Sequence, residues 1–403
     1  MHSKLNVLIV GNGHYATGST VLEGKVATDK DYGVLLPAIL ELRKQNIVGE
    51  VYLAAKDGRK FPALRKKLNS MHKEFGWDTD IETYPMDGAI EEKAYQRAME
   101  DLPRSGGALI AVPDKLHKEV IMDAIRNGHH FFVVKPAVVK TKDLLEVMHS
   151  QEKAGVLGMV DYHKCFDEVN LILREEYRKG AYGRLQHVFT KMTQRRDMLE
   201  IFGNWLKNSD TNINHYLGSH YIHLTGFITE ATPVSVRATA QFGVAREEFG
   251  IDTPDLIETQ IEWKSRDNSR FISYHVAGWA DPSETASMTY QEIHLIGTKA
   301  HVESDQRYRG YQTALVGKGQ QIVNPYFFNL HRGINGDLDL ESKYGFRSVK
   351  TFVKAALEVN NGVKIAKFEN RLPTIRESRN VTAILEAADL SLKEGSKIVS
   401  IGK

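Results

Sequence analysis

The stretch LNVLIVGNGHYA at residues 5–16 decides the fold of the first part of the chain. Residues 5–10 form a short apolar run that is rich in β-branched side chains, which is typical of a buried strand. The pattern G-x-G-x-x-A follows at once. Glycine permits a tight turn and lets the backbone approach a pyrophosphate, whose charge is favoured at a helix N-terminus. The stretch therefore predicts the first strand, turn and helix of a dinucleotide-binding domain.

Short apolar strands and helices alternate after this turn. The expected strands are residues 48–54, 107–112, 130–134 and 158–162, and the expected helices 35–42, 61–75, 116–127 and 141–155. Such alternation predicts a doubly wound parallel sheet with helices on both faces. The helix that should follow the glycine turn is delayed, because residues 17–30 have the composition of a loop inserted into the first crossover.

Longer strands follow residue 165, and their apolar and polar residues alternate. They are expected at residues 185–193, 234–242, 256–264, 269–277 and 291–303. This alternation is typical of an antiparallel sheet with one covered face and one open face. We expect the open face to pair two or more copies of the chain as a homodimer or homotetramer.

The two patterns together predict an α/β protein of two domains. A Rossmann domain with a doubly wound parallel sheet is expected over residues 1–160, with the insertion at about 17–30. An α+β domain with a large, mostly antiparallel, open-faced sheet is expected over 161–403, for substrate binding and oligomerisation. The last helix, at 374–394, is expected to pack back on the Rossmann domain.

Composition and charge exclude several classes of protein. The 403 residues include 53 Lys and Arg against 51 Asp and Glu, a net charge of +2 that does not indicate a nucleic-acid partner. The single cysteine, Cys165, allows no internal disulfide and fits a reducing compartment. We find no signal peptide and no apolar run long enough to span a membrane, so we expect a cytoplasmic protein without a membrane partner.

The end of the second strand bears on the type of cofactor. An acidic residue there normally accepts the ribose hydroxyls, and Ala55 stands at the expected position. Lys56 and Arg59 can instead pair with a 2′-phosphate, while Asp57 can serve if the register slips. The expected cofactor is NAD or NADP, with a preference for NADP. Its predicted binding residues are Gly11, Asn12, Gly13, His14, Tyr15, Ala16, Lys56, Arg59, Val112, Pro113, His117, Lys135 and Pro136.

Two further segments carry candidate chemistry. Lys135 follows the strand at 130–134, and a lysine at the carboxyl end of a parallel strand can hold a substrate hydroxyl and ease its loss of a proton. Tyr216, His220 and His223 are spaced i, i+4, i+7, so on a regular helix they share one face. Histidine exchanges protons near neutral pH, which suits His220 to acid/base work.

These strings together resemble the glucose-fructose oxidoreductase / inositol dehydrogenase / MocA (Gfo/Idh/MocA) family. The matching pieces are residues 11–16, 111–117, 135–136, 162–166 and 218–223. The resemblance implies an NAD(P)-dependent enzyme that acts on a CH–OH group of a small polar substrate, namely a sugar, cyclitol or sugar derivative. It also implies that Lys135 is the catalytic lysine and His220 the acid/base histidine. The chain departs from the family at Val134, Tyr216 and His223, where the family often has acidic residues.

The predicted catalytic residues are therefore Lys135, His220 and Tyr216, and the predicted substrate-binding residues are Tyr162, His163 and His223. We expect no metal, because no carboxylate completes a ligand set with the histidines at 215, 220 and 223. Two alternatives remain open. One is a cofactor-binding regulator of the same fold that has lost the chemistry. The other is redox-assisted elimination or glycoside cleavage, in which NAD is reduced only transiently.

Overall fold

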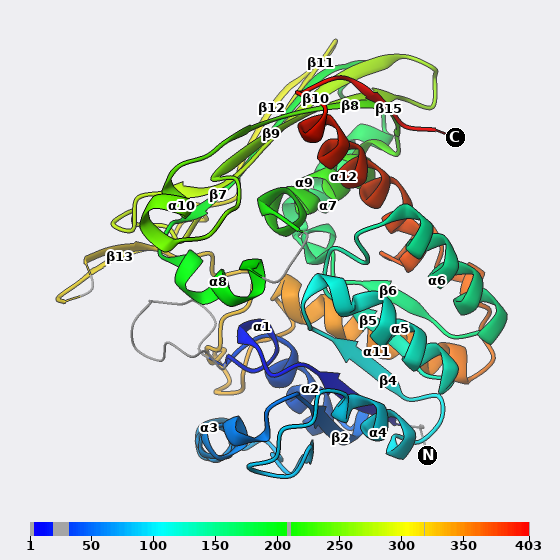
Figure 1. The fold of residues 1–403 in the computed structure, drawn as a ribbon, viewed down its shortest axis with the longest axis vertical. Helices are drawn as coiled ribbons and strands as arrows, with labels where there is room; N and C mark the ends of the chain where they lie inside the picture. Colours follow the sequence, from blue (N-terminus) through cyan, green and yellow to red (C-terminus); the bar gives the residue numbers. More distant parts are fainter. Residues whose placement is uncertain (1–3, 19–31, 208–210, 318, 403) are drawn as a thin grey trace. The chain divides into compact units, whose positions relative to one another are not determined.

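The computed structural model describes residues 4–18, 32–207, 211–317 and 319–402 (Figure 1). They form two compact units. Unit 1 comprises Met1–Ala137, Lys142–His163 and Phe328–Glu377, and unit 2 comprises Val138–Thr141, Lys164–Phe327 and Ser378–Lys403. This division differs from two continuous domains that meet at residue 160, because the chain returns to unit 1 at Phe328. Most of the expected insertion at 17–30 lies outside the described residues.

Unit 1 contains a six-stranded parallel sheet in the order β3-β2-β1-β4-β5-β6. The strands are β1 (Leu5–Val10), β2 (Val48–Ala54), β3 (Glu82–Tyr84), β4 (Gly107–Ile110), β5 (His130–Val133) and β6 (Gly158–Val160). They are short and almost wholly buried, as strands covered on both faces must be. The strand order reverses between β1 and β4. The predicted doubly wound sheet is confirmed.

The helices of unit 1 begin and end where local sequence favours it. They are α1 (His14–Thr17), α2 (Leu35–Lys44), α3 (Phe61–Phe75), α4 (Ala94–Asp101), α5 (His117–Arg126), α6 (Thr141–Ala154) and α11 (Tyr344–Asn360). As one example, α3 has a proline in its first turn and ends at Gly76 in the left-handed conformation, which glycine adopts without strain.

Helix α11 comes from the far end of the chain and packs against β1, β5 and α2. Its buried side includes Phe346, Val349 and Phe352, and the rings of Phe352 and Phe132 lie 5.3 Å apart. Within unit 1, α11 is thus the helix from the end of the chain that covers this sheet, and the packing of the last helix on the Rossmann domain stays a prediction. The last helix, α12 (Ser378–Lys393), lies in unit 2 against β8 and α9. There the Ser391 hydroxyl accepts the N–H of Ala238 at 2.9 Å.

Unit 2 contains a seven-stranded sheet in the order β12-β11-β7-β10-β9-β8-β15. The strands are β7 (Leu185–Arg195), β8 (Thr232–Gln241), β9 (Leu256–Lys264), β10 (Arg270–Asp281), β11 (Thr289–Gly297), β12 (His301–Asp305) and β15 (Val399–Ser400). All neighbours are antiparallel except β7 and β10, which confirms the mostly antiparallel sheet. The single strand expected at 291–303 is two strands, because the chain turns at residues 298–300.

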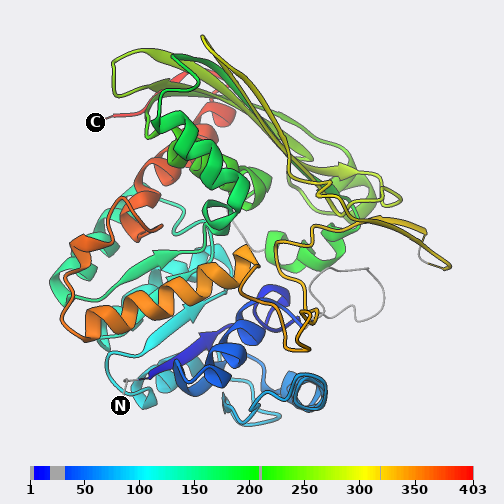
Figure 2. The same cartoon turned by 180° about the vertical axis from the view of Figure 1, so that it is seen from behind.

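One face of this sheet is covered by helices of unit 2, namely α7 (Glu168–Arg178), α9 (Ser219–Thr229) and α12 (Figure 2). Buried residues such as Val188, Ile261 and Ala277 alternate along the strands with half-buried or exposed ones. The remaining elements are α8 (Met198–Lys207), α10 (Val244–Phe249) and the hairpin of β13 (Gln312–Leu315) and β14 (Gly319–Ile322). Among the described residues, no helix combines the length and the apolar character that crossing a membrane requires.

Candidate cofactor and substrate sites

The glycine turn lies at the carboxyl end of β1, beside β4. Gly11 has φ +113°, and a Cβ built on it would lie 2.2 Å from the carbonyl oxygen of Ala111. Only glycine therefore allows the two strand ends to approach this closely. Gly13 caps α1, and a Cβ on it would meet no atom within 4 Å. The turn thus presents bare backbone to open space at the place where the strand order reverses, which fits the pyrophosphate of a dinucleotide.

The first crossover helix is split into two pieces. Helix α1 is a single turn that ends at Gly18, and the chain returns at Gly33, where a Cβ would lie 2.6 Å from the Gly18 nitrogen. The N–H of Val34 donates to the carbonyl of Tyr15 at 2.7 Å. The chain therefore leaves and re-enters the crossover at one point, and α2 starts at once. This geometry explains why the apolar helical pattern begins only after residue 32.

His117 links the loops that follow β4 and β5. Its ring nitrogens lie 2.8 Å from the carbonyl oxygen of Pro136 and 2.9 Å from that of Val112, and the side chain is fully buried. The Lys135–Pro136 peptide is cis. We conclude that His117 holds the segment that carries Lys135 against the neighbouring loop. A direct contact with a cofactor is not needed to account for this histidine.

A buried carboxylate, Asp161, joins three parts of unit 1 that are distant in sequence. Its oxygens accept hydrogen bonds from the Tyr15 hydroxyl of α1 and from the Ser348 hydroxyl of α11, the latter at 2.7 Å. His163 Nδ1 lies 3.8 Å from the same carboxylate, and its ring stacks on Tyr344 at 5.7 Å. Figure 2 shows the N-terminal end of α11 beside α1.

Asp161 and α11 are functional candidates that sequence analysis missed. Two of the predicted site residues, Tyr15 and His163, lie beside Asp161. A third, Tyr162, is buried in the core with 1% of its surface exposed. The available signal was the position of Asp161 directly after β6, at the carboxyl edge of the sheet. Ser348 and Tyr344 follow no strand of this sheet, so nothing in the local sequence pointed to them.

Two cations at the end of β2, Lys56 and Arg59, have acidic partners. Lys56 pairs with Glu92 at 2.8 Å, and Arg59 makes two hydrogen bonds of 2.8 Å with Asp57. The hydrogen bond from Arg59 lowers the pKa of Asp57 to about 2. The Asp57 carboxylate also accepts the N–H of Arg59 at 3.1 Å, at the start of a short 3-10 helix, Gly58–Lys60. The local charge is therefore balanced.

In unit 2, Tyr216 lies in a π-helical turn, Asn214–Gly218, which runs directly into α9. Its ring centroid lies 4.7 Å from that of Phe202, 5.8 Å from that of Trp205 and 6.3 Å from that of Trp279. A π-helical turn holds more residues than an α-helical one, so Tyr216 is displaced around the helix axis from the position that a regular α-helix would give it. The rings that contact Tyr216 are different from the ring that contacts His223.

His220 and His223 are both buried in α9, with 5% and 4% of their surfaces exposed. The His223 ring stacks on the Phe227 ring, with 6.1 Å between their centroids. The Arg174 guanidinium lies 3.9 Å from the centre of the Phe227 ring. Burial, with a contribution from the Arg174 charge, lowers the pKa of His223 to about 3. His223 is therefore neutral near pH 7 and lies in a packed, cationic environment.

His215, the third histidine of this segment, has its own acidic neighbour, because its Nε2 lies 3.5 Å from Asp389 of α12. Across the part of the chain that the structure describes, no group of three His, Cys, Asp or Glu side chains could hold a metal ion. The two arginines after β7 are also compensated. Arg195 pairs with Asp197, and Arg196 pairs with Glu248 at 2.6 Å.

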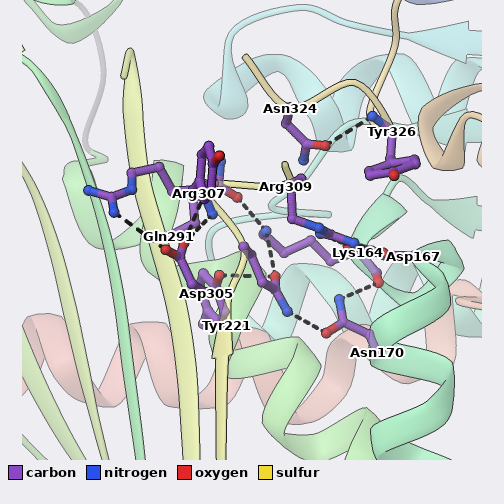
Figure 3. Close-up of polar contacts among 12 residues, drawn as sticks. Lys164, Asp167, Asn170, Tyr221, Gln291, Asp305, Arg307, Arg309, Asn324 and Tyr326 are labelled. Carbon is purple, nitrogen blue, oxygen red and sulfur yellow. Dashed lines mark hydrogen bonds and ion pairs between the residues drawn. The ribbon is translucent and has the colours of Figure 1, made fainter. Parts of the chain in front are cut away.

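A buried lysine that the sequence analysis did not single out, Lys164, is the centre of a polar network in unit 2 (Figure 3). Its ammonium donates to Gln291 at 2.6 Å and to Gln306 at 3.3 Å, and it lies 4.7 Å from the centre of the Tyr221 ring. The Tyr221 hydroxyl donates to the same Gln306 oxygen at 3.1 Å. Burial lowers the pKa of Lys164 to about 7.

The network ties α7 and α9 to the edge of the sheet. Gln306 donates to Asn170 of α7 at 2.5 Å, and Arg309 makes two hydrogen bonds with Asp167, at 2.8 and 3.0 Å. Figure 3 shows these groups on both sides of Lys164. Since Tyr221 directly follows His220, the network holds the beginning of α9, where that histidine lies. The signal in the sequence was the position of Lys164 within residues 162–166, one of the pieces that resemble the family.

Comparison with known proteins agrees with this geometry. Residues 48–162 match the family model described as "Oxidoreductase family, NAD-binding Rossmann fold". Over 115 residues the chain is 26% identical to 2,7-anhydro-N-acetylneuraminate hydratase of Escherichia coli (strain K12); this alignment spans 28% of the chain and 30% of that relative. The family match begins at β2, after the split crossover, and includes Lys135.

Solved structures resemble the chain over its whole length. Myo-inositol 2-dehydrogenase from Lactobacillus plantarum superposes with a TM-score of 0.67 at 16% identity, covering 99% of this chain and all of that one. Scyllo-inositol dehydrogenase from Lactobacillus casei, solved with NAD(H) and scyllo-inositol, gives 0.65 at 14% identity, with both chains fully covered. At these identities the likeness establishes the fold. Residues 48–162 are therefore similar to an oxidoreductase family with an NAD-binding Rossmann fold, and the whole chain shares the fold of these two dehydrogenases.

Proposed function

We propose that this protein is an NAD-dependent oxidoreductase that transfers a hydride between the nicotinamide and a carbinol carbon of a sugar, cyclitol or sugar derivative. The glycine turn carries the proposal, because bare backbone at Gly11 and Gly13 lies where a doubly wound sheet binds dinucleotides. When bound, the nicotinamide supplies the hydride acceptor or donor. The family match supports the same reading.

The contacts at the end of β2 favour NAD over the NADP suggested by the sequence. The two cations that the sequence offered to a 2′-phosphate, Lys56 and Arg59, are paired with carboxylates. The Asp57 carboxylate is ionised and suits the ribose hydroxyls while it repels a phosphate. Calorimetric titration tests this choice. We expect NAD to bind at least tenfold more tightly than NADP, and Asp57→Ala to reduce that ratio. Tighter NADP binding by the wild type would contradict the assignment.

Lys135 and His220 are the proposed catalytic groups. The Lys135 ammonium, at the carboxyl end of β5, donates a hydrogen bond to the substrate hydroxyl oxygen and stabilises its negative charge. The His220 imidazole takes the hydroxyl proton during oxidation and returns it during reduction. These roles rest on the family resemblance, since Lys135 belongs to unit 1 and His220 to unit 2. We assign buried His223 to the packing of α9, and Tyr216 to the orientation of the substrate.

The substrate proposed here is a neutral polyol. Arg195 and Arg196, the two arginines at the end of β7, are each paired with an acidic side chain. A charged substrate would have to break one of these pairs, and removing one partner of a pair leaves an uncompensated charge. Hydroxyl groups, in contrast, can hydrogen-bond to polar side chains without disturbing that balance.

Turnover measurements on the purified protein test the activity. With NAD and scyllo-inositol, myo-inositol or a panel of sugars, we expect reduced nicotinamide to accumulate. Lys135→Ala should reduce kcat by about 100-fold or more, because general acid–base and electrostatic groups contribute on that order. Its Kd for NAD should stay within about twofold, and exposed Lys115→Ala is the matched control. Wild-type turnover in Lys135→Ala would refute the role of Lys135, and tight NAD binding without any turnover would favour the regulator.

A second candidate is suggested by the relative named as a hydratase. In this route the chain would catalyse elimination or hydration, with oxidation of the substrate only as a transient step. The distinguishing measurement is product mass. A product that differs from the substrate by one water, formed without accumulation of reduced nicotinamide, would support this route. A product lacking two hydrogens would support the dehydrogenase.

We also propose that the open face of the seven-stranded sheet joins copies of the chain. This face carries the half-buried Phe189 and Tyr274 together with Ile272 and Ile296, which are 38% and 41% exposed. Apolar side chains gathered on one face of a sheet favour burial against a partner. An isologous contact between two such faces gives a closed dimer.

A further inference from the structure

Unit 2 contains a cluster of four aromatic side chains from three separate elements. Phe202 and Trp205 come from α8, Tyr216 from the π-helical turn and Trp279 from β10. Phe202 and Trp205 lie 6.0 Å apart with their rings at 69°. Trp279 is fully buried behind Tyr216, whereas the other three rings are only half-buried. We call these three rings the aromatic wall.

We propose that the aromatic wall receives the C–H face of a ring-shaped polyol, so that the enzyme prefers cyclic over open-chain substrates. The inference rests on the proposed function and deepens it. The face of an aromatic ring carries partial negative charge. A ring whose hydroxyls are equatorial presents axial C–H bonds, which carry partial positive charge, on its flat faces. An open-chain polyol with the same number of hydroxyls has no such face.

Polar groups accompany the wall at the same edge of the sheet. Strands β7 and β10 are parallel neighbours, so their carboxyl ends meet, with Arg195 opposite Asp281. The Thr193 hydroxyl donates to Asp281 at 2.6 Å, and burial raises the pKa of this half-buried carboxyl. Trp279 lies two residues before Asp281, and α8 follows directly after the end of β7.

This combination is the one that a polyol requires. Binding sites for small molecules place a few polar groups beside aromatic and apolar surface. Here the Asp281 carboxylate and the Thr193 hydroxyl oxygen can accept hydrogen bonds from substrate hydroxyls, while the wall covers the apolar face. Tyr216 also precedes His220 by four residues in one continuous helical segment. A substrate ring held on Tyr216 would therefore lie within one turn of the proposed acid/base histidine.

Tryptophan fluorescence tests the wall directly. The chain has four tryptophans, and Trp77, Trp263 and Trp279 are all at most 1% exposed, so Trp205 alone can sense a ligand at the surface. In the presence of NAD, we expect scyllo-inositol to shift the emission and to protect it from acrylamide quenching. An open-chain hexitol at the same concentration should cause neither change.

Variants at Trp205 then measure how much its ring contributes to the affinity for a cyclic polyol. Trp205→Leu should abolish the fluorescence change and raise the Kd for scyllo-inositol about three- to tenfold, the range that one aromatic stacking contact accounts for. Trp205→Phe keeps a ring face and should stay within about twofold. The NAD affinity of both variants should equal that of the wild type, which also reports correct folding. Phe189→Leu, on the other face of the sheet, is the matched control.

The outcomes separate this inference from the proposed function. If the wild type oxidises polyols but Trp205→Leu binds cyclitols as tightly as the wild type, the wall is refuted and the activity stands. If ring polyols perturb Trp205 but no turnover occurs, the wall stands and the proposed activity fails. If no ring polyol or sugar changes the emission of Trp205, the wall is refuted whatever the activity.

Discussion

Lys164 should make the free energy of unfolding of unit 2 rise with pH, and the substitution Lys164→Met should remove this dependence. Its side chain is buried with 2% exposed, and burial lowers its pKa to about 7; the nearby Arg309 acts in the same direction, and Asp167 opposes both. A lysine in the unfolded chain titrates near 10.4. Between these values the unfolded chain binds a proton that the folded protein has released. The free energy of unfolding must therefore rise with pH across this window.

The size of the effect follows from the two pKa values. Below pH 7 the folded protein carries the full cost of holding a buried ammonium, and this cost is relieved as the pH rises toward 10. Between pH 6 and pH 9 the expected gain in the free energy of unfolding is about 2–3 kcal/mol. Lys164→Met has a similar length but does not titrate, so it lacks this gain. Its loss of the hydrogen bond to Gln291 adds an offset that is the same at every pH.

The assay is urea unfolding of wild type and Lys164→Met at pH 6, 7, 8 and 9, followed by tryptophan fluorescence. Three of the four tryptophans belong to unit 2, so the signal reports the unit that contains Lys164. The quantity compared is the difference in the free energy of unfolding between the two proteins at each pH. Groups that titrate in the same way in both proteins do not contribute to this difference. Exposed Lys264→Met controls for the loss of a lysine as such. A difference that stays constant from pH 6 to pH 9 would refute the reasoning.

Three further predictions concern the other parts of the molecule. Gly11→Ala should lower the melting temperature and weaken NAD binding at least tenfold by calorimetry, because the new Cβ would clash with the Ala111 carbonyl; unchanged NAD affinity would contradict the turn assignment. Asp161→Ala should lower the free energy of unfolding by about 2–4 kcal/mol in denaturant titrations, since two hydroxyl donors lose a buried acceptor, and Ser348→Ala should cost less. Ile272→Lys should shift the mass by light scattering toward the monomer, and an unchanged mass would place the subunit contact elsewhere.

Much of the fold could be predicted because its signals are local. Short apolar strands, glycine stops and helical periodicity depend on neighbouring residues, so five of the six strands of the parallel sheet were predicted close to their observed bounds. The sixth strand, β3, has only three residues and was not predicted. The alternation of the later strands likewise predicted an open sheet. The division into units could not be predicted in the same way. It depends on the contacts of α11 with β1 and β5, which are more than 200 residues away in the sequence.

The candidate site divides in the same way. The positions of Gly11 and Lys135 after strands were predicted, because the carboxyl ends of parallel strands lie at one edge. The pairing of Arg59 with Asp57 was not, although the two are near in sequence, since a side-chain hydrogen bond depends on rotamers and on the short 3-10 helix between them. The spacing of Tyr216, His220 and His223 predicted a regular helix, and the π-helical turn that contains Tyr216 has no periodicity of its own in the sequence.

What the sequence determined by itself is the dinucleotide-binding turn, the alternation of strands and helices, and the residue types available for chemistry. Each follows from backbone freedom or from the periodic burial of side chains, which adjacent residues decide. Only the tertiary structure decided that Asp161 joins α1 to α11, that Lys164 is buried among amide oxygens, and that three half-buried rings from α8 and the π-helical turn meet. Those arrangements depend on desolvation and on contacts between distant segments, and both come into being only when the chain has packed.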